Sequence, residues 1–91
     1  MKRKMIGLTL LLTLAAAAPA WAEAAGGGWW DHGTNTGSVY SNYVHPANIH
    51  CSSVQGTRYN FSGPQPAHVM ANSTAPVVWV GTNYAWYNNN C

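Results

Sequence analysis

The chain has 91 residues and only six charged side chains, four basic and two acidic, so its formal net charge is +2 with neutral histidines. Three of the basic residues are Lys2, Arg3 and Lys4, which leaves the chain after residue 22 with one arginine against two carboxylates, a formal net charge of −1. A chain with one arginine and no lysine cannot neutralise several phosphates at once. This excludes nucleic-acid binding through counterion release, and adhesion to anionic membranes by charge alone.

The N-terminus has the three parts of a secretory signal peptide. Basic residues 2–4 precede an apolar run over residues 5–18, and a small-x-small sequence ends at Ala22. The pattern predicts a helical signal peptide over residues 1–22, cleaved between Ala22 and Glu23, and a secreted, extracellular product. The apolar run is shorter than the roughly 20 residues that span a bilayer, so a membrane anchor is the less favoured interpretation. We expect no stable membrane insertion of the mature chain.

The two cysteines, Cys51 and Cys91, are candidates for a covalent staple. Residues 23–91 suffice for one small domain, and chains of this size often need such a staple. An even cysteine count in an exported chain favours a disulfide, which the loop-closure model credits with about 4 kcal/mol. A free thiol, or an intermolecular bridge from the terminal Cys91, remains as an alternative.

The first residues of the mature chain are small and rich in glycine, which predicts a flexible leader over residues 23–28. Trp29 and Trp30 then begin a short strand, and a turn-rich loop over residues 34–37 follows it. Adjacent strand residues point to opposite faces, so one tryptophan is expected in the core and the other at the surface. Closure of one end of the core by both rings is the alternative.

Residues 38–54 contain two β-favouring runs on either side of Pro46-Ala47-Asn48, which predicts a β-hairpin. Pairing across this turn sets His45 opposite His50 and separates two faces. The residues expected to face the core are Tyr40, Val44 and Cys51, and those expected to face outward are Tyr43, His45 and His50. A shift of one residue in the register would exchange the two faces.

The C-terminal half alternates between short strands and turns. Residues 57–62 predict a strand with Tyr59 and Phe61 directed inward, and a Gly-Pro-rich break over residues 63–66 ends it. The segments that follow are a shorter strand over residues 67–71, a loop over 72–75, a buried strand over 77–80, a turn over 81–83 and an aromatic run over 84–87. No segment after residue 22 has helical periodicity. The sequence therefore predicts an all-β chain with a single small antiparallel β-sandwich domain over residues 29–91.

Signatures of catalysis are weak in this chain. The two carboxylates, Glu23 and Asp31, offer no pair for glycoside hydrolysis, since Glu23 lies in the predicted leader. No local signature supports a triad of Asp31, a histidine and a serine. We therefore expect a protein that is not an enzyme and has no cofactor. Zinc bound by His32, His45 and His50 is a weaker alternative, because nothing in the sequence brings His32 to the other two, and no metal is expected.

Four segments carry a family resemblance. They are Trp-Asp-His-Gly at residues 30–33, Ser-Val-Tyr-Ser-Asn-Tyr-Val-His at 38–45, His-Cys-Ser-Ser-Val at 50–54 and Tyr-Ala-Trp-Tyr at 84–87. Together they resemble the lactococcin 972 family of bacteriocins, over nearly the whole mature chain, with residues 40–43 as the most specific part. The resemblance implies a small exported β-sandwich protein, acting as a homodimer, that binds the cell-wall precursor lipid II and blocks septum formation. The type member has no cysteines, so the predicted disulfide gains no support from the family.

A lipid II ligand suits the aromatic and imidazole side chains of the chain. Aromatic rings stack on sugars, and histidines donate hydrogen bonds to pyrophosphate. Without lysines, the pyrophosphate would be held by neutral donors, protonated histidine or backbone N–H groups. The residues predicted to bind the ligand are Trp29, Trp30, His32, Tyr43, His45 and His50. A non-toxic cell-envelope or carbohydrate-binding β module and a structural exoprotein that favours β assembly are the alternative functions.

Overall fold

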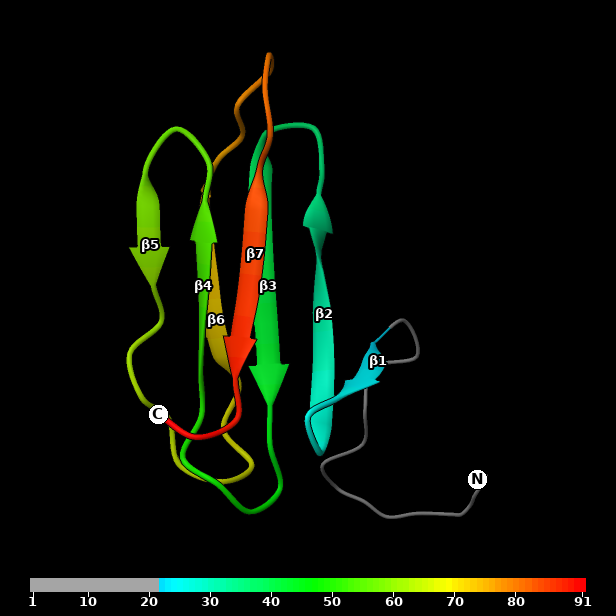
Figure 1. The fold of residues 1–91 in the computed structure, drawn as a ribbon, viewed down its shortest axis with the longest axis vertical. Helices are drawn as coiled ribbons and strands as arrows, with labels where there is room; N and C mark the ends of the chain where they lie inside the picture. The colour runs from blue at the N-terminus through cyan, green and yellow to red at the C-terminus, as the bar shows by residue number, and fades with distance from the viewer. Residues whose placement is uncertain (1–21) are drawn as a thin grey trace.

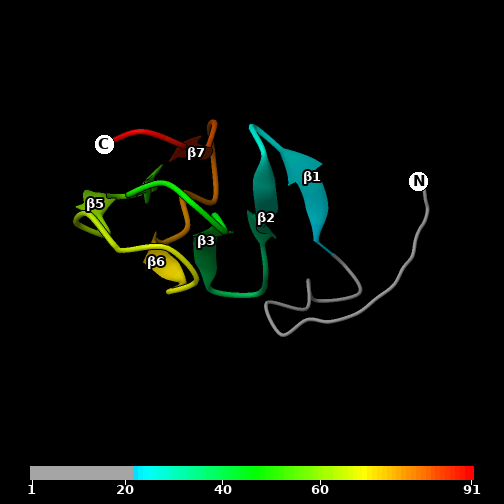
Figure 2. The same cartoon turned by 90° about the horizontal axis from the view of Figure 1, so that it is seen from below.

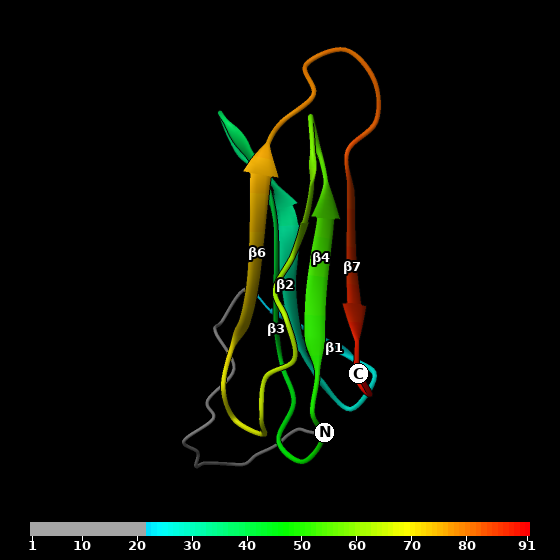
Figure 3. The same ribbon diagram turned by 90° about the vertical axis from the view of Figure 1, so that its left-hand side faces the viewer.

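The computed structural model describes residues 22–91, which form seven β-strands and no helix. The strands are β1 (Glu23–Ala25), β2 (Gly28–Thr34), β3 (Ser38–Val44), β4 (Cys51–Gln55), β5 (Tyr59–Phe61), β6 (Ala71–Pro76) and β7 (Tyr84–Asn88) (Figure 1). They build two antiparallel sheets with the strand orders β1-β2-β3-β6 and β5-β4-β7, and the sheets pack face to face (Figure 3). The predicted all-β antiparallel sandwich is confirmed.

The predicted signal peptide lies outside the described residues, apart from Ala22. Among residues 22–91, the structure contains no helix that is long and apolar enough to cross a membrane.

Residues 23–28, predicted as a flexible leader, belong instead to the four-stranded sheet. β1 and β2 form a hairpin in which Ala25 pairs with Gly28 across a tight turn. Gly26 and Gly27 in this turn have φ angles of 57° and 86°, a region that favours glycine. The glycine-rich composition therefore reflects a turn requirement here. β1 extends past the edge of the three-stranded sheet, as the view from below shows (Figure 2).

The predicted hairpin over residues 38–54 is wrong, because its two strands lie in different sheets. β3 pairs with β2 and β6, whereas β4 pairs with β5 and β7. Residues 45–50 cross from one sheet to the other (Figure 3). β3 and β4 therefore meet through their side chains. The serines Ser41 and Ser52 lie between these strands, and their small side chains let the two sheets approach closely.

This arrangement also corrects the predicted faces. Tyr43, His45 and His50 were expected to face outward, but their exposed fractions are 0%, 7% and 0%. Val44 and Cys51 are buried as expected, and Tyr40 is partly exposed. The register of β3 explains why Tyr43 is buried. Tyr43 pairs with Ala71 of β6, and both side chains point toward the second sheet.

The space between the sheets changes in character along the strands. An apolar cluster of Val39, Val54 and Ala75 fills one end. The middle holds hydrogen-bonded serines: Ser52 Oγ lies 2.9 Å from Ser73 Oγ and donates to the carbonyl oxygen of Ser41, also at 2.9 Å. Tyr43 and the two buried histidines occupy the other end. Such buried hydroxyls are stable only because each has partners.

Two further predictions, one of a strand and one of a loop, are wrong because β6 buries small side chains. β6 covers residues predicted as a loop, while the predicted strand over residues 67–71 is loop except for Ala71. The side chains that β6 turns inward are those of Ala71, Ser73 and Ala75. In the sequence, alanine and serine that alternate with polar residues predict a turn-forming stretch. Only the close packing against β4 makes this stretch a buried strand.

The predicted buried strand over residues 77–80 is also wrong. These residues form part of the loop between β6 and β7. Val77 is buried, but Trp79 and Val80 are 76% and 92% exposed. β-branched residues favour strands, yet no neighbouring strand is available to this loop, which projects beyond both sheets (Figures 1 and 3).

The predicted disulfide between Cys51 and Cys91 is confirmed, with Cα atoms 6.2 Å apart. It joins the first residue of β4 to the last residue of the chain. The N–H of Cys91 also donates to the carbonyl oxygen of Ile49 at 3.2 Å, which holds the C-terminal segment against the β3–β4 loop.

Candidate functional site

Three of the six residues predicted to bind ligand have structural roles inside the sandwich. The Tyr43 hydroxyl donates to the carbonyl oxygen of Ala25 at 2.8 Å and ties the β1–β2 hairpin to β3. The Nδ1 atom of His45 accepts hydrogen bonds from the N–H groups of Ala47 and Asn48, at 3.1 and 2.9 Å. These contacts fix local backbone, and both side chains are buried.

His50 is the third buried member of the predicted set. Its two ring nitrogens lie 2.8 Å and 2.6 Å from the carbonyl oxygens of Asn48 and Val69. The His45 and His50 rings are neighbours, with centroids 6.4 Å apart, but they meet inside the sandwich and hold the loops around them. Within residues 22–91, no three side chains of histidine, cysteine, aspartate or glutamate cluster so as to hold a metal ion.

Burial of Tyr43 leads to a prediction about alkaline stability. Burial raises the pKa of its phenol above the ordinary value of 10.0, and the neighbouring Tyr87 raises it further, against a smaller opposing effect of a hydrogen bond with the Gly28 backbone. The folded state therefore holds this proton more tightly than the unfolded chain does. The resulting stability is fully present below about pH 10 and is lost as the pH rises beyond it.

We expect the urea midpoint of unfolding to fall between about pH 9 and about pH 11 in the natural protein, and to fall less in Tyr43→Phe. The phenylalanine variant also loses the hydrogen bond to Ala25, so it is expected to be about 1 kcal/mol less stable at neutral pH. Tyr59→Phe, at a 56% exposed position, is the control and should keep the full pH dependence. If the urea midpoint of Tyr43→Phe fell with pH as much as that of the natural protein, the role given to the Tyr43 phenol would be contradicted.

The other three predicted residues lie on β2 and are accessible. Trp29 is 38% exposed, while Trp30 faces the second sheet, as expected for adjacent strand residues. The Trp30 ring stacks on His32 with centroids 3.6 Å apart, and its Nε1 donates to Ser41 Oγ at 2.8 Å. The Nε2 atom of His32 lies 3.4 Å from a carboxylate oxygen of Glu23 on β1. Both rings are thus held in place by β1 and β3.

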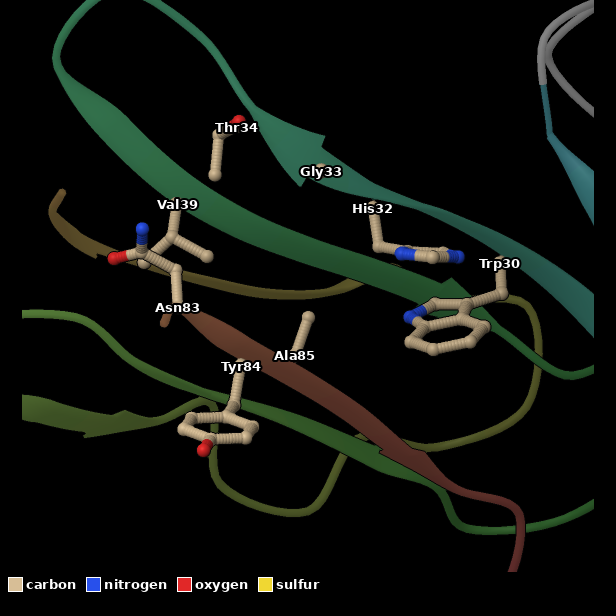
Figure 4. Close-up of a pocket in the computed structure, with 8 residues that line it drawn as sticks. All are labelled: Trp30, His32, Gly33, Thr34, Val39, Asn83, Tyr84 and Ala85. Carbon is tan, nitrogen blue, oxygen red and sulfur yellow. The ribbon is translucent and has the colours of Figure 1, made fainter. Parts of the chain in front are cut away.

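Trp30 and His32 line a cleft of about 300 Å³ at the side where β2 is only partly covered by β7. Figure 4 shows the two rings side by side on β2, with Ala85 of β7 directed toward them. The cleft is mainly apolar, and the side-chain amide of Asn83 at its rim is engaged with the backbone of Val78. It therefore presents few polar groups that would orient a ligand.

A second concave surface lies on the outer side of the three-stranded sheet, where the sequence predicted none. Ser53 of β4 pairs with Phe61 of β5 on one side and with Trp86 of β7 on the other. Gln55 is flanked in the same way by Tyr59 and Tyr84. Two rows of aromatic rings, about 10 Å apart, therefore border a polar strip along β4. We call these six residues the aromatic face.

All four rings of the aromatic face are exposed to solvent, with exposed fractions between 45% and 56%. The rings of Tyr84 and Trp86 are nearly parallel, with an interplanar angle of 8° and centroids 5.7 Å apart. A hollow of about 230 Å³ lies between the rows and is lined by Ser53, Phe61 and Trp86, with Asn88 at one end. Its lining contains no charged residue, so the surface suits a neutral ligand with flat apolar faces and hydroxyl or amide groups.

The alternating pattern around Tyr59 and Phe61 indicates this surface, but the prediction directed the aromatic side of the strand toward the core. Tyr59 and Phe61 alternate with polar residues, as strand residues should, and were predicted to point inward. In the structure the inward residue of β5 is Asn60, which pairs with Val54 and donates to the carbonyl oxygen of Thr74 at 2.8 Å. This bond reaches across to the four-stranded sheet and fixes the aromatic rings on the outside.

Comparison with known proteins gives one match. A family model described as bacteriocin (lactococcin 972) matches residues 26–87, from the β1–β2 turn to β7. No curated protein and no solved structure matches the chain. The match covers more than half of the chain and includes strands of both sheets, in agreement with the resemblance of the four segments. The chain therefore belongs to the lactococcin 972 family of bacteriocins.

Proposed function

We propose that this protein is a secreted bacteriocin that binds the cell-wall precursor lipid II and thereby blocks wall and septum synthesis in related bacteria. It acts by binding, without an enzymatic step. Family membership supports the bacteriocin assignment. The observation that carries the proposed ligand is the aromatic face, a row of exposed rings on either side of a neutral polar strip.

The chemistry of the aromatic face matches a short N-acetylated saccharide. The apolar faces of pyranose rings stack on aromatic side chains, and Ser53, Gln55 and Asn88 offer hydrogen-bond partners for hydroxyl and acetamido groups. Successive outward residues along a strand are about 7 Å apart, so each pair of rings meets a different part of the saccharide. The disaccharide of lipid II has these features.

The position of Arg58 supports an orientation for the ligand. It is the only lysine or arginine after residue 22, is exposed, and directly precedes Tyr59 in the turn between β4 and β5. A diphosphate at this end of the aromatic face would meet a guanidinium group, and arginine binds phosphate oxygens in a bidentate manner. The saccharide would then extend along the strands toward Trp86 and Asn88.

The proposal predicts that lipid II, added in excess, protects sensitive bacteria from the purified protein. Bound ligand occupies the aromatic face and removes the free protein from solution. The measurement is the minimal inhibitory concentration on related strains, with and without lipid II. Undecaprenyl diphosphate, which keeps the lipid and the diphosphate but lacks the disaccharide, is the matched control and should give no protection. Killing that is unaffected by lipid II at every ratio would reject it as the ligand.

The aromatic face also favours a second function, a non-toxic carbohydrate-binding module of the cell envelope, because stacking on saccharides does not require lipid II. This alternative predicts binding to purified cell walls without growth inhibition of any related strain. The same growth assay therefore separates the two functions.

A further inference from the structure

The loop between β6 and β7 has an apolar tip that no other part of residues 22–91 covers. Trp79 and Val80 are 76% and 92% exposed, more than any other large hydrophobic side chain in the described chain. The loop projects beyond both sheets at one end of the molecule (Figures 1 and 3). Adjacent, highly exposed apolar side chains on a projecting loop mark a surface for interaction.

Hydrogen bonds hold this loop in a defined shape. The Oδ1 atom of Asn83 accepts from the N–H of Val78 at 2.7 Å, and its Nδ2 donates to the carbonyl oxygen of Val78 at 3.0 Å. Val77, at the base, is buried, and its N–H donates to the carbonyl oxygen of Gly37 at 3.1 Å. A clamped and anchored loop presents Trp79 and Val80 to solvent as part of the fold.

The charges of the mature chain are arranged unequally around this tip. The β4–β5 turn, which carries Arg58, adjoins the base of the loop, because the N–H of Thr57 donates to the carbonyl oxygen of Pro76 at 2.9 Å. Glu23 lies on β1 at the opposite end of the molecule, and Asp31 lies midway along β2 (Figure 1). The end with the apolar tip thus has the single Lys or Arg side chain of residues 22–91 and neither of their carboxylates.

We propose that this end of the molecule docks on the surface of a membrane that contains anionic phospholipid. Trp79 and Val80 enter the boundary between headgroups and acyl chains, where tryptophan is favoured, and Arg58 lies at the level of the phosphates. A projecting, convex tip fits a yielding lipid surface better than a preformed protein groove. Docking is peripheral, through two side chains and one cation, and requires no spanning segment.

Docking by itself does not depend on lipid II and goes beyond the proposed function. One consequence does rest on that function: with the tip on the membrane, the aromatic face begins beside Arg58 and runs along the strands away from the lipid surface. A saccharide linked through diphosphate to a membrane lipid would rise from the bilayer along the same direction. The fold would then orient the protein toward a ligand attached to the membrane.

The test is co-sedimentation of the purified, disulfide-bonded protein with large unilamellar vesicles that contain no lipid II. Vesicles of equimolar phosphatidylglycerol and phosphatidylcholine are compared with vesicles of phosphatidylcholine alone. We expect binding to the mixed vesicles, a decrease of at least tenfold in the partition coefficient for Trp79→Ser, and a decrease of several-fold for Val80→Ser. Arg58→Gln should weaken binding to mixed vesicles and leave binding to phosphatidylcholine unchanged.

Ile49→Ser is the matched control for Val80→Ser. Ile49 is 55% exposed in the β3–β4 loop, at the opposite end of the molecule (Figure 1), and its replacement should leave vesicle binding unchanged. Circular dichroism establishes that each variant is folded.

Absence of binding by the natural protein, or equal binding by the natural protein and Trp79→Ser, would overturn the proposal. A loss of self-association in Trp79→Ser without a loss of vesicle binding would also overturn it and assign the tip to a protein interface. Because lipid II is absent from the vesicles, failure here leaves the protection assay to judge the ligand separately.

Discussion

Replacement of both Cys51 and Cys91 by serine is expected to lower the free energy of unfolding by about 4 kcal/mol at 25 °C. The disulfide closes a loop of 40 residues, and its loss frees that loop in the unfolded chain. The apolar cluster in the sandwich is small, with only Val39, Val54 and Ala75 at its centre. Domains of this size have total stabilities on the order of 5 to 10 kcal/mol, so the double variant should retain only roughly 1 to 6 kcal/mol.

The measurement is urea unfolding followed by tryptophan fluorescence at neutral pH. Reduction of the natural protein with dithiothreitol should reproduce the loss, because it breaks the same bond without a change of sequence. Cys91→Ser alone should do the same, because it removes one half of the bridge, and non-reducing electrophoresis should show a monomer for the natural protein. Equal urea midpoints for the natural protein and the double variant would mean that the sheets are stable without the disulfide.

Trp86→Ala is expected to reduce both killing and lipid II binding by roughly thirtyfold. Removal of a central aromatic anchor typically costs about 2 kcal/mol of binding free energy, which corresponds to that factor. Trp86 borders the hollow of the aromatic face and is 45% exposed, so its side chain contributes little to the core. The bond from Ser41 Oγ to the Trp86 backbone oxygen survives the substitution, so the fold should be retained.

Two further variants decide whether the loss comes from the aromatic face. Trp86→Phe keeps a stacking ring and should retain most of the activity. Trp29→Ala removes an exposed tryptophan that is on the other sheet and was predicted from the sequence to bind the ligand. Activity that depends on Trp29 and is unchanged in Trp86→Ala would place the ligand on β2, beside the cleft of Trp30 and His32, and would contradict the aromatic face.

Much of the local structure could be predicted because local patterns determine it. The predicted strand that begins at Trp29 is present in β2, and the predicted loop over residues 34–37 is present except that Thr34 still belongs to β2. The aromatic run at residues 84–87 forms most of β7. β6 could not be predicted, since its buried residues are alanine and serine, which carry almost no hydrophobic pattern. Its stability as a strand comes from pairing with β3 and packing against β4, which are distant in sequence.

The buried and exposed faces of two strands were predicted the wrong way round for a related reason. An alternating pattern identifies two faces of a strand but does not say which face is covered. For Tyr43 the expected solvent face turned out to be the packing face, and for Tyr59 and Phe61 the reverse is true. In both cases the decision rests on β3 and β4 lying in opposite sheets, which the turn at residues 46–48 does not reveal.

The exposure of the apolar tip, Trp79 and Val80, also could not be predicted from the sequence. The charge count argues against adhesion to anionic membranes by charge alone, because Arg58 is the only Lys or Arg after residue 22. The run Val77 to Val80 suggested a buried strand instead of an exposed loop. Only the fold places Trp79 and Val80 at the end of the molecule, next to Arg58.

The sequence by itself determined the all-β character of the chain and its resemblance to a bacteriocin family, because these depend on local residue patterns and composition. It left the pairing of the two cysteines open, and the structure shows that they form one bridge. The tertiary structure alone decided which sheet each strand joins, and with it which aromatic rings are buried. That choice is made by contacts between residues far apart in the chain, above all the close approach of β3 and β4 through Ser41 and Ser52. The exposed aromatic face and the apolar tip are both consequences of that packing.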